Sequence, residues 1–269
     1  MRAASLKTLP GISVVCPTYN SADFVLSAIK SVVDQALPPA ELIVSDDGST
    51  DDTLDKIERF LLDCKVDFPT RILRNPHRGV AATRNAGILA ASQEWIAFLD
   101  SDDIWMPEKL LKVSETIQKY PDVNFIHHYK QRLNFDKTNS LVDIKYKFRH
   151  DIPLIKQLFK KNIFSTPAVT CKKEFLINNG MFNTNYYCCE DYDLWIRLSP
   201  HMKLHVIEDV LCHYFTRHGS ITSNSTTQML INDIKIKTCH RNKVSLGLYI
   251  HGILLAMGVY LYEKIRRRF

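Results

Sequence analysis

Several common signatures of function are missing from this sequence. Neither G-x-x-x-x-G-K-[ST] nor G-x-G-x-x-G occurs, which excludes the nucleotide sites that are built on glycine-rich loops. The seven cysteines include no C-x-x-C pair, so we expect a reduced, cytosolic chain without a zinc site. The N-terminal segment lacks the long apolar stretch of a signal peptide. No basic stripe is interleaved with aromatic residues, and nucleic acid is therefore not an expected partner.

The composition is that of an ordinary globular protein. The 269 residues are 45% hydrophobic and 24% charged, which suits one main domain with a smaller appendage. The formal net charge is +6, and part of the excess lies at Lys264 and residues 266–268, near the C-terminus. A short basic cluster beside an apolar segment is typical of contact with anionic lipids.

An acidic segment at the end of a buried strand is the first sign of a site. Residues 95–99 form an apolar run with the length of a buried strand, and Asp100, Asp102 and Asp103 follow it directly. Carboxylates so close together repel one another unless a cation compensates them, and Mg²⁺ and Mn²⁺ prefer oxygen ligands. The alternative is that Asp102 or Asp103 caps a helix that begins at Pro107.

Strands and helices alternate along the first half of the sequence. Short β-rich runs are separated by segments in which apolar residues recur at helical spacing, which predicts an α/β fold with a mostly parallel sheet flanked by helices. The second expected strand also ends in acid, at Asp46 and Asp47, so both acidic loops should lie at one edge of the sheet. A turn followed by a capped helix is the alternative for this loop. The expected strands cover residues 12–16, 41–45, 71–74 and 95–99.

Four motifs in a fixed order make the sequence similar to a known family. They lie at residues 14–20 (VVCPTYN), 41–51 (ELIVSDDGSTD), 78–85 (RGVAATRN) and 98–103 (FLDSDD). Together they resemble the family 2 inverting glycosyltransferases of the bacterial surface-polysaccharide type. The resemblance implies a GT-A fold, the nucleotide-diphospho-sugar transferase fold, with a helical C-terminal tail.

On the donor side, the resemblance implies contacts with a nucleotide and a metal. Tyr19 would pack against the base, and Asp47 would accept a hydrogen bond from it. Asp102 would be the direct metal ligand of a D-x-D-like motif, with Asp100 beside it, and the cofactor would be Mn²⁺ or Mg²⁺. Arg84 would either reach the nucleotide or be a structural helix residue. The other expected donor-binding residues are Pro17, Thr18, Asn20, Asp46, Arg78 and Ser101.

The residues that carry the chemistry are expected in the second half. Glu190 and Asp191 precede a helix that is anchored by Leu194 and Trp195. The helix dipole alone favours acids in a first turn, but in the family this pair supplies the catalytic base. Asp191 is therefore the expected base, with Glu190 as a substitute base or an acceptor contact.

A looser match follows at residues 211–221. Here the resemblance implies that Arg217 covers the donor diphosphate and that His218 adds a metal ligand. An exposed loop histidine is the alternative for His218.

The chain is expected to divide into a GT-A domain at 1–225 and a helical tail at 226–269. Within the domain, the donor half would cover about residues 11–112 and the acceptor and catalytic half about residues 113–225. Residues 244–262 are almost continuously apolar and reach the lower limit for crossing a bilayer, about 17–25 residues. Their glycines and tyrosines favour a helix that lies on the membrane surface, and docking on the domain or on another subunit is the alternative.

The expected function is an inverting transfer of a sugar from a nucleotide-sugar donor, UDP-sugars first, to a hydroxyl of an acceptor sugar on a lipid-linked glycan. Inversion needs one positioned base and no covalent enzyme intermediate. The expected location is cytoplasmic, peripheral or tail-anchored on the cytosolic face of the inner membrane, where the tail meets an anionic surface. A homo-oligomer, a degenerate transferase that acts as a scaffold, and a sugar nucleotidyltransferase remain open, although the last lacks its glycine-rich phosphate loop.

Overall fold

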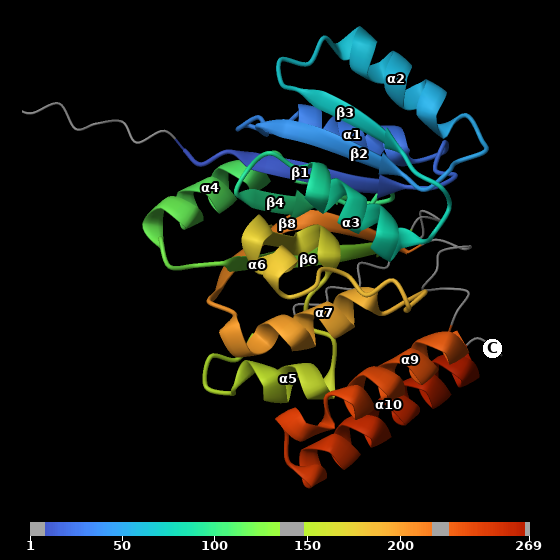
Figure 1. The fold of residues 1–269 in the computed structure, drawn as a ribbon, viewed down its shortest axis with the longest axis vertical. Helices are drawn as coiled ribbons and strands as arrows, with labels where there is room; N and C mark the ends of the chain where they lie inside the picture. The colour runs from blue at the N-terminus through green and yellow to red at the C-terminus, as the bar shows by residue number, and fades with distance from the viewer. Residues whose placement is uncertain (1–8, 135–147, 217–225, 267–269) are drawn as a thin grey trace, which may run out of the picture.

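The computed structural model describes residues 9–134, 148–216 and 226–266, and the strands in these ranges form one sheet (Figure 1). The strands are β1 (Ile12–Thr18), β2 (Glu41–Asp46), β3 (Thr70–Arg74), β4 (Trp95–Phe98), β5 (Ile104–Trp105), β6 (Phe125–Asn134), β7 (Val169–Lys172) and β8 (Leu204–Thr216). The helices are α1 (Val25–Val33), α2 (Thr53–Cys64), α3 (Val80–Ala90), α4 (Lys109–Lys119), α5 (Leu154–Lys160), α6 (Lys173–Asn178), α7 (Glu190–Leu198), α9 (Thr226–Cys239) and α10 (Leu246–Arg266). The strand order is β3-β2-β1-β4-β7-β6-β8-β5.

The first half of the chain forms a purely parallel block. β3, β2, β1 and β4 lie side by side, and each neighbouring pair is parallel. Every residue of β1 and β2 is buried, because helices cover both faces of the sheet. Burial on both faces explains why these strands are continuous apolar runs and do not alternate. The four strands expected here are confirmed.

The second half adds a mixed block to the same sheet. β7 is antiparallel to both β4 and β6, whereas β6 is parallel to β8. The two-residue strand β5 pairs with β8 in antiparallel fashion. The sequence patterns reveal neither β5 nor the long β8, and the helix expected from Pro107 begins at Lys109. Partners far apart in the sequence hold these strands, and local patterns do not report such pairings.

The helices cover the sheet in two layers. α1, α2 and α4 pack on one face with Val14 and Cys16 of β1, and α3, α5 and α7 pack on the other face with Val15. A Cβ atom at Gly87 of α3 would overlap the side chain of Val15. Glycine at this position therefore allows α3 to rest directly on β1, where it can carry side chains to the edge of the sheet.

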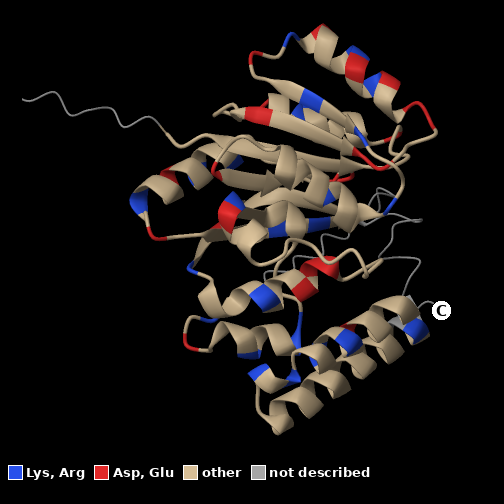
Figure 2. Cartoon of the chain, viewed as in Figure 1, with Lys and Arg blue, Asp and Glu red and all other residues tan. Residues whose placement is uncertain are grey.

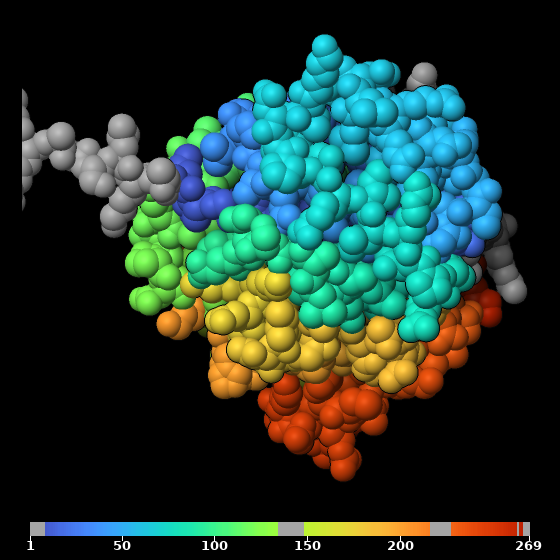
Figure 3. All heavy atoms as spheres, turned by 45° about the horizontal axis from the view of Figure 1, so that its top comes forward, coloured from blue at the N-terminus to red at the C-terminus, as the bar shows by residue number. Residues whose placement is uncertain are grey.

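The two tail helices pack against the second half of the chain. α9 contacts α7, α10 contacts α5, and the pair forms the end of the molecule opposite α2 (Figures 1 and 3). Asn232 Nδ2 donates to the carbonyl of Cys188 at 2.9 Å, and His240 Nε2 lies 3.1 Å from Asp193 Oδ1. Among the helices of the three described ranges, none combines the length and apolarity needed to cross a bilayer.

Candidate functional site

The acidic loops meet at one edge of the sheet, as predicted. β1, β2, β4, β6 and β8 run in the same direction, so their carboxyl ends share this edge. Ser21 Oγ, after β1, lies 3.1 Å from Ser101 Oγ, after β4. The backbone N–H of Phe215, in β8, donates to Asp103 Oδ1 at 3.0 Å. Acidic residues accordingly gather near the ends of β1 and β2 and at the start of α7 (Figure 2).

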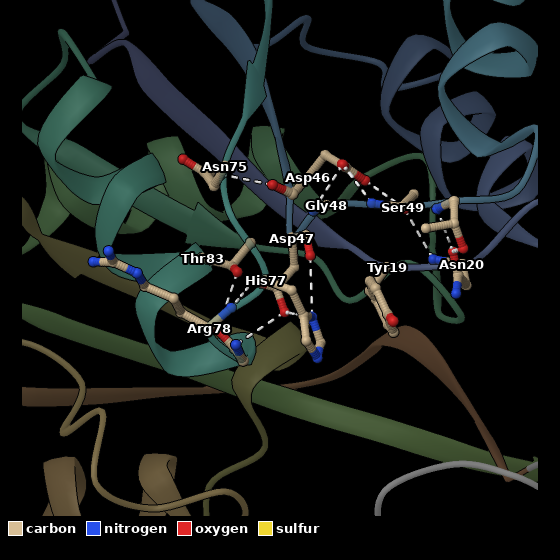
Figure 4. A network of polar contacts seen from close by, with 12 residues as sticks. Tyr19, Asn20, Asp46, Asp47, Gly48, Ser49, Asn75, His77, Arg78 and Thr83 are labelled. Carbon is tan, nitrogen blue, oxygen red and sulfur yellow. Dashed lines mark hydrogen bonds and ion pairs between the residues drawn. The ribbon is translucent and has the colours of Figure 1, made fainter.

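Asp46 shapes the loop that follows β2 (Figure 4). Its Oδ2 accepts from the backbone N–H groups of Gly48 and Ser49, at 3.0 and 2.9 Å, and its Oδ1 accepts from Ser49 Oγ at 2.5 Å. Gly48 has φ of 77°, a value that glycine adopts without steric cost. Asn20 Oδ1 accepts from the N–H of Thr50 at 2.8 Å and fastens this loop to the end of β1. Asp46 and Asn20 therefore fix the conformation of the loop after β2. The turn that was the alternative interpretation of this loop is present.

Asp47 joins β2 to the segment before α3 (Figure 4). Its Oδ1 and Oδ2 accept from the backbone N–H groups of Arg78 and Gly79, both at 2.9 Å. His77 Nδ1 lies 2.9 Å from Asp47 Oδ2, and the His77 ring stacks on Tyr19 with centroids 4.3 Å apart. Tyr19 is 42% exposed. An exposed aromatic pair beside a carboxylate suits a nucleobase, which stacks on π-faces and presents N–H groups.

His77 is a site residue that the sequence analysis missed. Its only signal is its place directly before Arg78 and Gly79 in the third motif. Some of the other expected donor-binding residues do not face the Tyr19–His77 pair. Pro17 and Thr18 are buried within β1, and the Arg78 side chain extends away from Tyr19 (Figure 4). The expected Arg217 and His218 lie outside the residues that the structure describes.

Arg84 links the acidic loop after β4 to the first turn of α7. Only 5% of this residue is exposed, and its guanidinium donates to Asp100 Oδ1 at 2.6 Å and to Glu190 Oε1 at 2.5 Å. Burial lowers the pKa of Arg84, but Asp100 and Glu190 outweigh burial and hold this pKa above its ordinary value. Arg84 is thus a buried residue that joins two acidic segments by ion pairs. This position agrees with the alternative that Arg84 is a structural helix residue.

Glu190 and Asp191 have different surroundings. Glu190 is buried against Arg84, and burial raises its pKa to about 7 although Arg84 acts in the opposite direction. Asp191 is less deeply buried, and its Oδ2 accepts from Asn162 Nδ2 at 3.2 Å and from Thr166 Oγ1 at 3.4 Å. Burial also raises the pKa of Asp191. One carboxylate is therefore held by a guanidinium and the other by neutral donors. Asn162 and Thr166 carried no motif and were not predicted.

Asp100, Asp102 and Asp103 form the candidate metal centre. Asp103 is fully buried, and its Oδ2 has no hydrogen-bond partner among the described residues. Burial, together with Asp102 and Asp100, raises the pKa of Asp103 well above its ordinary value. In the described part of the chain, no three His, Cys, Asp or Glu side chains are arranged to enclose a cation. Mg²⁺ commonly binds one or two carboxylates and completes its shell with substrate phosphates. Asp100 Oδ1 already accepts from Arg84, so Asp102 and the second oxygen of Asp100 are the groups that could contribute to such an open site.

Lys130 is a further side chain at this edge that no motif revealed. It extends from β6, and its Nζ donates to Ser165 Oγ at 2.6 Å and lies 3.8 Å from the centroid of the Tyr214 ring. Burial lowers the pKa of Lys130, and Asp103 and Asp191 act to raise it. Pairing of β6 with β8 brings this lysine to the edge of the sheet. Local sequence patterns do not predict a pairing between strands so far apart in the chain.

Comparison with known proteins identifies relatives that cover most of the chain. The family described as Glycosyl transferase family 2 matches residues 13–178. An uncharacterized glycosyltransferase of Haemophilus influenzae is 30% identical over 232 residues, which cover 83% of this chain and 76% of that protein. The UDP-Glc:alpha-D-GlcNAc-diphosphoundecaprenol beta-1,3-glucosyltransferase WfaP of Escherichia coli is 27% identical and covers 90% of this chain and 94% of its own. The mannosyltransferase PcManGT of Pyrobaculum calidifontis, solved with GDP-Man and Mn²⁺, superposes with a TM-score of 0.67 at 17% identity, over 94% of this chain and 70% of that one.

Proposed function

Because this chain belongs to glycosyl transferase family 2, we propose that it transfers a sugar from a UDP-sugar to a hydroxyl of an acceptor sugar, with inversion at the anomeric carbon. The family and the GT-A fold that the motifs implied are both confirmed, and the chain is a glycosyltransferase. UDP as the carrier is supported by the name of the E. coli relative, which uses UDP-Glc.

Asp191 is the general base of the proposed reaction. The observation that carries this assignment is its contrast with Glu190, whose carboxylate is bound to the Arg84 guanidinium. Asp191 is held by neutral donors from Asn162 and Thr166 and is the more accessible of the two. As the acceptor oxygen bonds to the anomeric carbon, the bond from that carbon to the diphosphate breaks and the acceptor proton passes to Asp191. A positioned base of this kind contributes about 10²–10⁴-fold to the rate.

The donor lies along the other side of the edge. Tyr19 and His77 stack on each other, and the base would stack on the outer face of this pair, with Asp47 beside His77 at 2.9 Å. Asp102 and Asp100 would hold a divalent cation, for which the Mn²⁺ in the PcManGT complex gives support. When bound, this cation neutralises the charge that grows on the departing diphosphate.

The acceptor is a lipid-linked sugar at the cytosolic face of the inner membrane. The E. coli relative is named for an acceptor on diphosphoundecaprenol. The outward side of α10 supports a membrane location, because its exposed residues are almost all apolar and include Leu246, Leu254 and Val259, which are 71%, 61% and 64% exposed. Figure 2 shows little charge on α10 before its C-terminal end, where basic residues follow. A helix with this pattern lies in the interfacial plane of a bilayer.

The proposed function is tested by UDP release from a panel of UDP-sugars, with Mn²⁺ or with EDTA, in the presence of a short-chain GlcNAc-diphosphate lipid. We expect metal-dependent turnover by the wild type and loss of metal-dependent donor binding in Asp102→Ala. Asp191→Asn should lower kcat by about 10²–10⁴-fold while UDP affinity is retained.

Glu190→Gln is the matched comparison for the base. An equal loss of kcat in Glu190→Gln and Asp191→Asn, with both proteins folded and binding UDP, would argue against Asp191 as the base. A wild-type protein that binds no UDP even with Mn²⁺ would contradict the transferase proposal itself.

A further inference from the structure

Two cations lie on the acceptor side of the edge without carboxylate partners. Lys130 and Arg132 are two residues apart on β6, so their side chains lie on the same face of the sheet. Arg132 pairs in register with Tyr214 of β8, whose ring lies under the Lys130 ammonium. Both cations are half-buried, and within the three described ranges neither forms an ion pair. Arg84, the other cation of this edge, is by contrast already paired with Asp100 and Glu190.

The Lys130 ammonium lies close to the proposed base. It donates to Ser165 Oγ at 2.6 Å, and the next residue, Thr166, donates to Asp191. A serine hydroxyl and an aromatic face solvate an ammonium only in part, and burial accordingly lowers the pKa of Lys130. Asp103 and Asp191 act on this ammonium electrostatically and raise its pKa, but neither carboxylate forms an ion pair with it in the described ranges. A ligand that brings negative charge into direct contact would therefore stabilise the half-buried cation.

The position on the sheet indicates which substrate supplies that charge. β6 is separated from β4 by β7, so Lys130 and Arg132 belong to the side that carries Asp191 and not to the side of Tyr19 and Asp47. The donor diphosphate is assigned to Asp100 and Asp102 after β4 and their cation. Asp103 of the same loop reaches β8 and acts electrostatically on Lys130, so the UDP measurement below is what separates the two diphosphates. A lipid-linked acceptor carries a second diphosphate, one sugar ring away from the hydroxyl that loses its proton.

We propose that Lys130 and Arg132 bind the diphosphate of a lipid-linked acceptor sugar. The proposal rests on the proposed function and specifies the acceptor subsite of that same site. The two side chains hold the anionic link between sugar and lipid, which aims the acceptor hydroxyl at Asp191. Charge-assisted hydrogen bonds from arginine and lysine are the usual means of holding phosphate.

The test measures binding of farnesyl diphosphate and of farnesol, with Mn²⁺ and saturating UDP, so that the donor site is filled. Wild-type protein should bind the diphosphate more tightly than the alcohol. Lys130→Met and Arg132→Met should each weaken binding of the diphosphate by about tenfold or more, because each removes a charge-assisted hydrogen bond. UDP affinity should be unchanged, and Lys130→Arg should keep most of the affinity for the diphosphate. Lys112→Met is the matched control, since Lys112 lies on α4 and pairs with Asp209 at 2.6 Å.

Three results would overturn the proposal: equal binding of the diphosphate and the alcohol by the wild type, unchanged binding in both methionine variants, or a matching loss of UDP affinity. The last result would assign the two cations to the donor. Arg132→Met keeps the test decisive if thermal melting shows that Lys130→Met does not fold. Failure of the wild type to bind UDP with Mn²⁺ would instead refute the proposed function, so the two failures are distinguishable.

Discussion

The two sides of the catalytic edge satisfy their charges in different ways. On the donor side, Asp46 and Asp47 accept hydrogen bonds from backbone N–H groups of nearby loops, and their positions need no ligand. On the acceptor side, Glu190 and Asp191 are held by side chains from two separate segments, α3 and residues 162–166, and Lys130 forms no ion pair in the described ranges. Under the proposed assignment, the donor side is thus formed before the substrate arrives, whereas the acceptor side contains charge that a substrate would complete.

Lys109 is buried more deeply than Lys130. Lys109 of α4 is fully buried, its Nζ lies 3.0 Å from the centroid of the Trp105 ring, and no hydrogen-bond partner for it is present among the described residues. Burial lowers its pKa well below the ordinary value. His127 and His128 of β6 are also buried with Nε2 atoms that lack partners in the described part of the chain. Lys109 belongs to the expected donor half and the two histidines to the acceptor half, so buried polar groups that cost stability occur in both halves of the described chain.

The largest effect on stability is expected at Arg84, which joins the donor side to the acceptor side. Arg84→Met leaves Glu190 as a buried carboxylate and Asp100 as a partly buried one without the guanidinium, and it should lower the free energy of unfolding by about 3–5 kcal/mol in urea titrations. Adding Glu190→Gln removes one of those charges and should recover part of the loss. Strictly additive effects of the two substitutions would show that the pair is not coupled.

A smaller effect is expected at the aromatic pair of the donor side. Tyr19→Ala removes the stacking surface and should raise the Kd for UDP, measured calorimetrically, by about tenfold, since base–aromatic stacking is worth about 1–3 kcal/mol. Tyr120→Ala is the matched control, because Tyr120 stacks on His205 at the same centroid distance of 4.3 Å but far from the edge. Equal UDP affinity of the two variants would remove Tyr19 from the donor site.

A similar loss is expected for the apolar face of α10. Leu254→Glu should weaken binding to vesicles that contain anionic phospholipid by about tenfold, because burying one leucine is worth about 1.5–3 kcal/mol. Leu62→Glu, on the distant helix α2, is the control, since Leu62 is even more exposed at 76%. Wild-type protein that remains in solution in a vesicle co-sedimentation assay would refute the membrane proposal.

The smallest effect is a gain in stability at Lys109. Lys109→Met keeps the apolar stem and removes the buried amine, so the free energy of unfolding at pH 7 should rise by about 1–3 kcal/mol. The pKa of Lys109 is lowered on folding, so the unfolded chain binds more protons and wild-type stability rises with pH until the ordinary value of 10.5 is reached. The advantage of the variant should therefore shrink between pH 7 and pH 10.5 in urea titrations at several pH values.

Lys112→Met, three residues along the same helix, tests whether this gain comes from burial. Lys112 is more exposed, so the substitution should change stability by less than about 0.5 kcal/mol. A gain of the same size at both positions would attribute the effect to helix propensity or net charge and not to the buried amine.

The donor side was predictable because its determinants are contiguous in the sequence. The strand before each acidic loop is an uninterrupted apolar run, and the residues that shape the loop after β2, from Asp46 to Ser49, follow one another in a motif. Local segments of this kind encode both an element and the turn that ends it. His77 escaped notice because its role depends on contact with Tyr19, which is distant in the sequence.

By itself, the sequence determined the family, the parallel block β3-β2-β1-β4 and the edge at which its acidic loops meet, because short-range patterns of burial and turn residues encode them. Only the tertiary structure decided which groups face one another there. Arg84 is placed between Asp100 and Glu190, and Lys130 beside Ser165, by strand pairing and helix packing across long stretches of chain. The energies of such groups depend on burial and on distant charges, which no local pattern records.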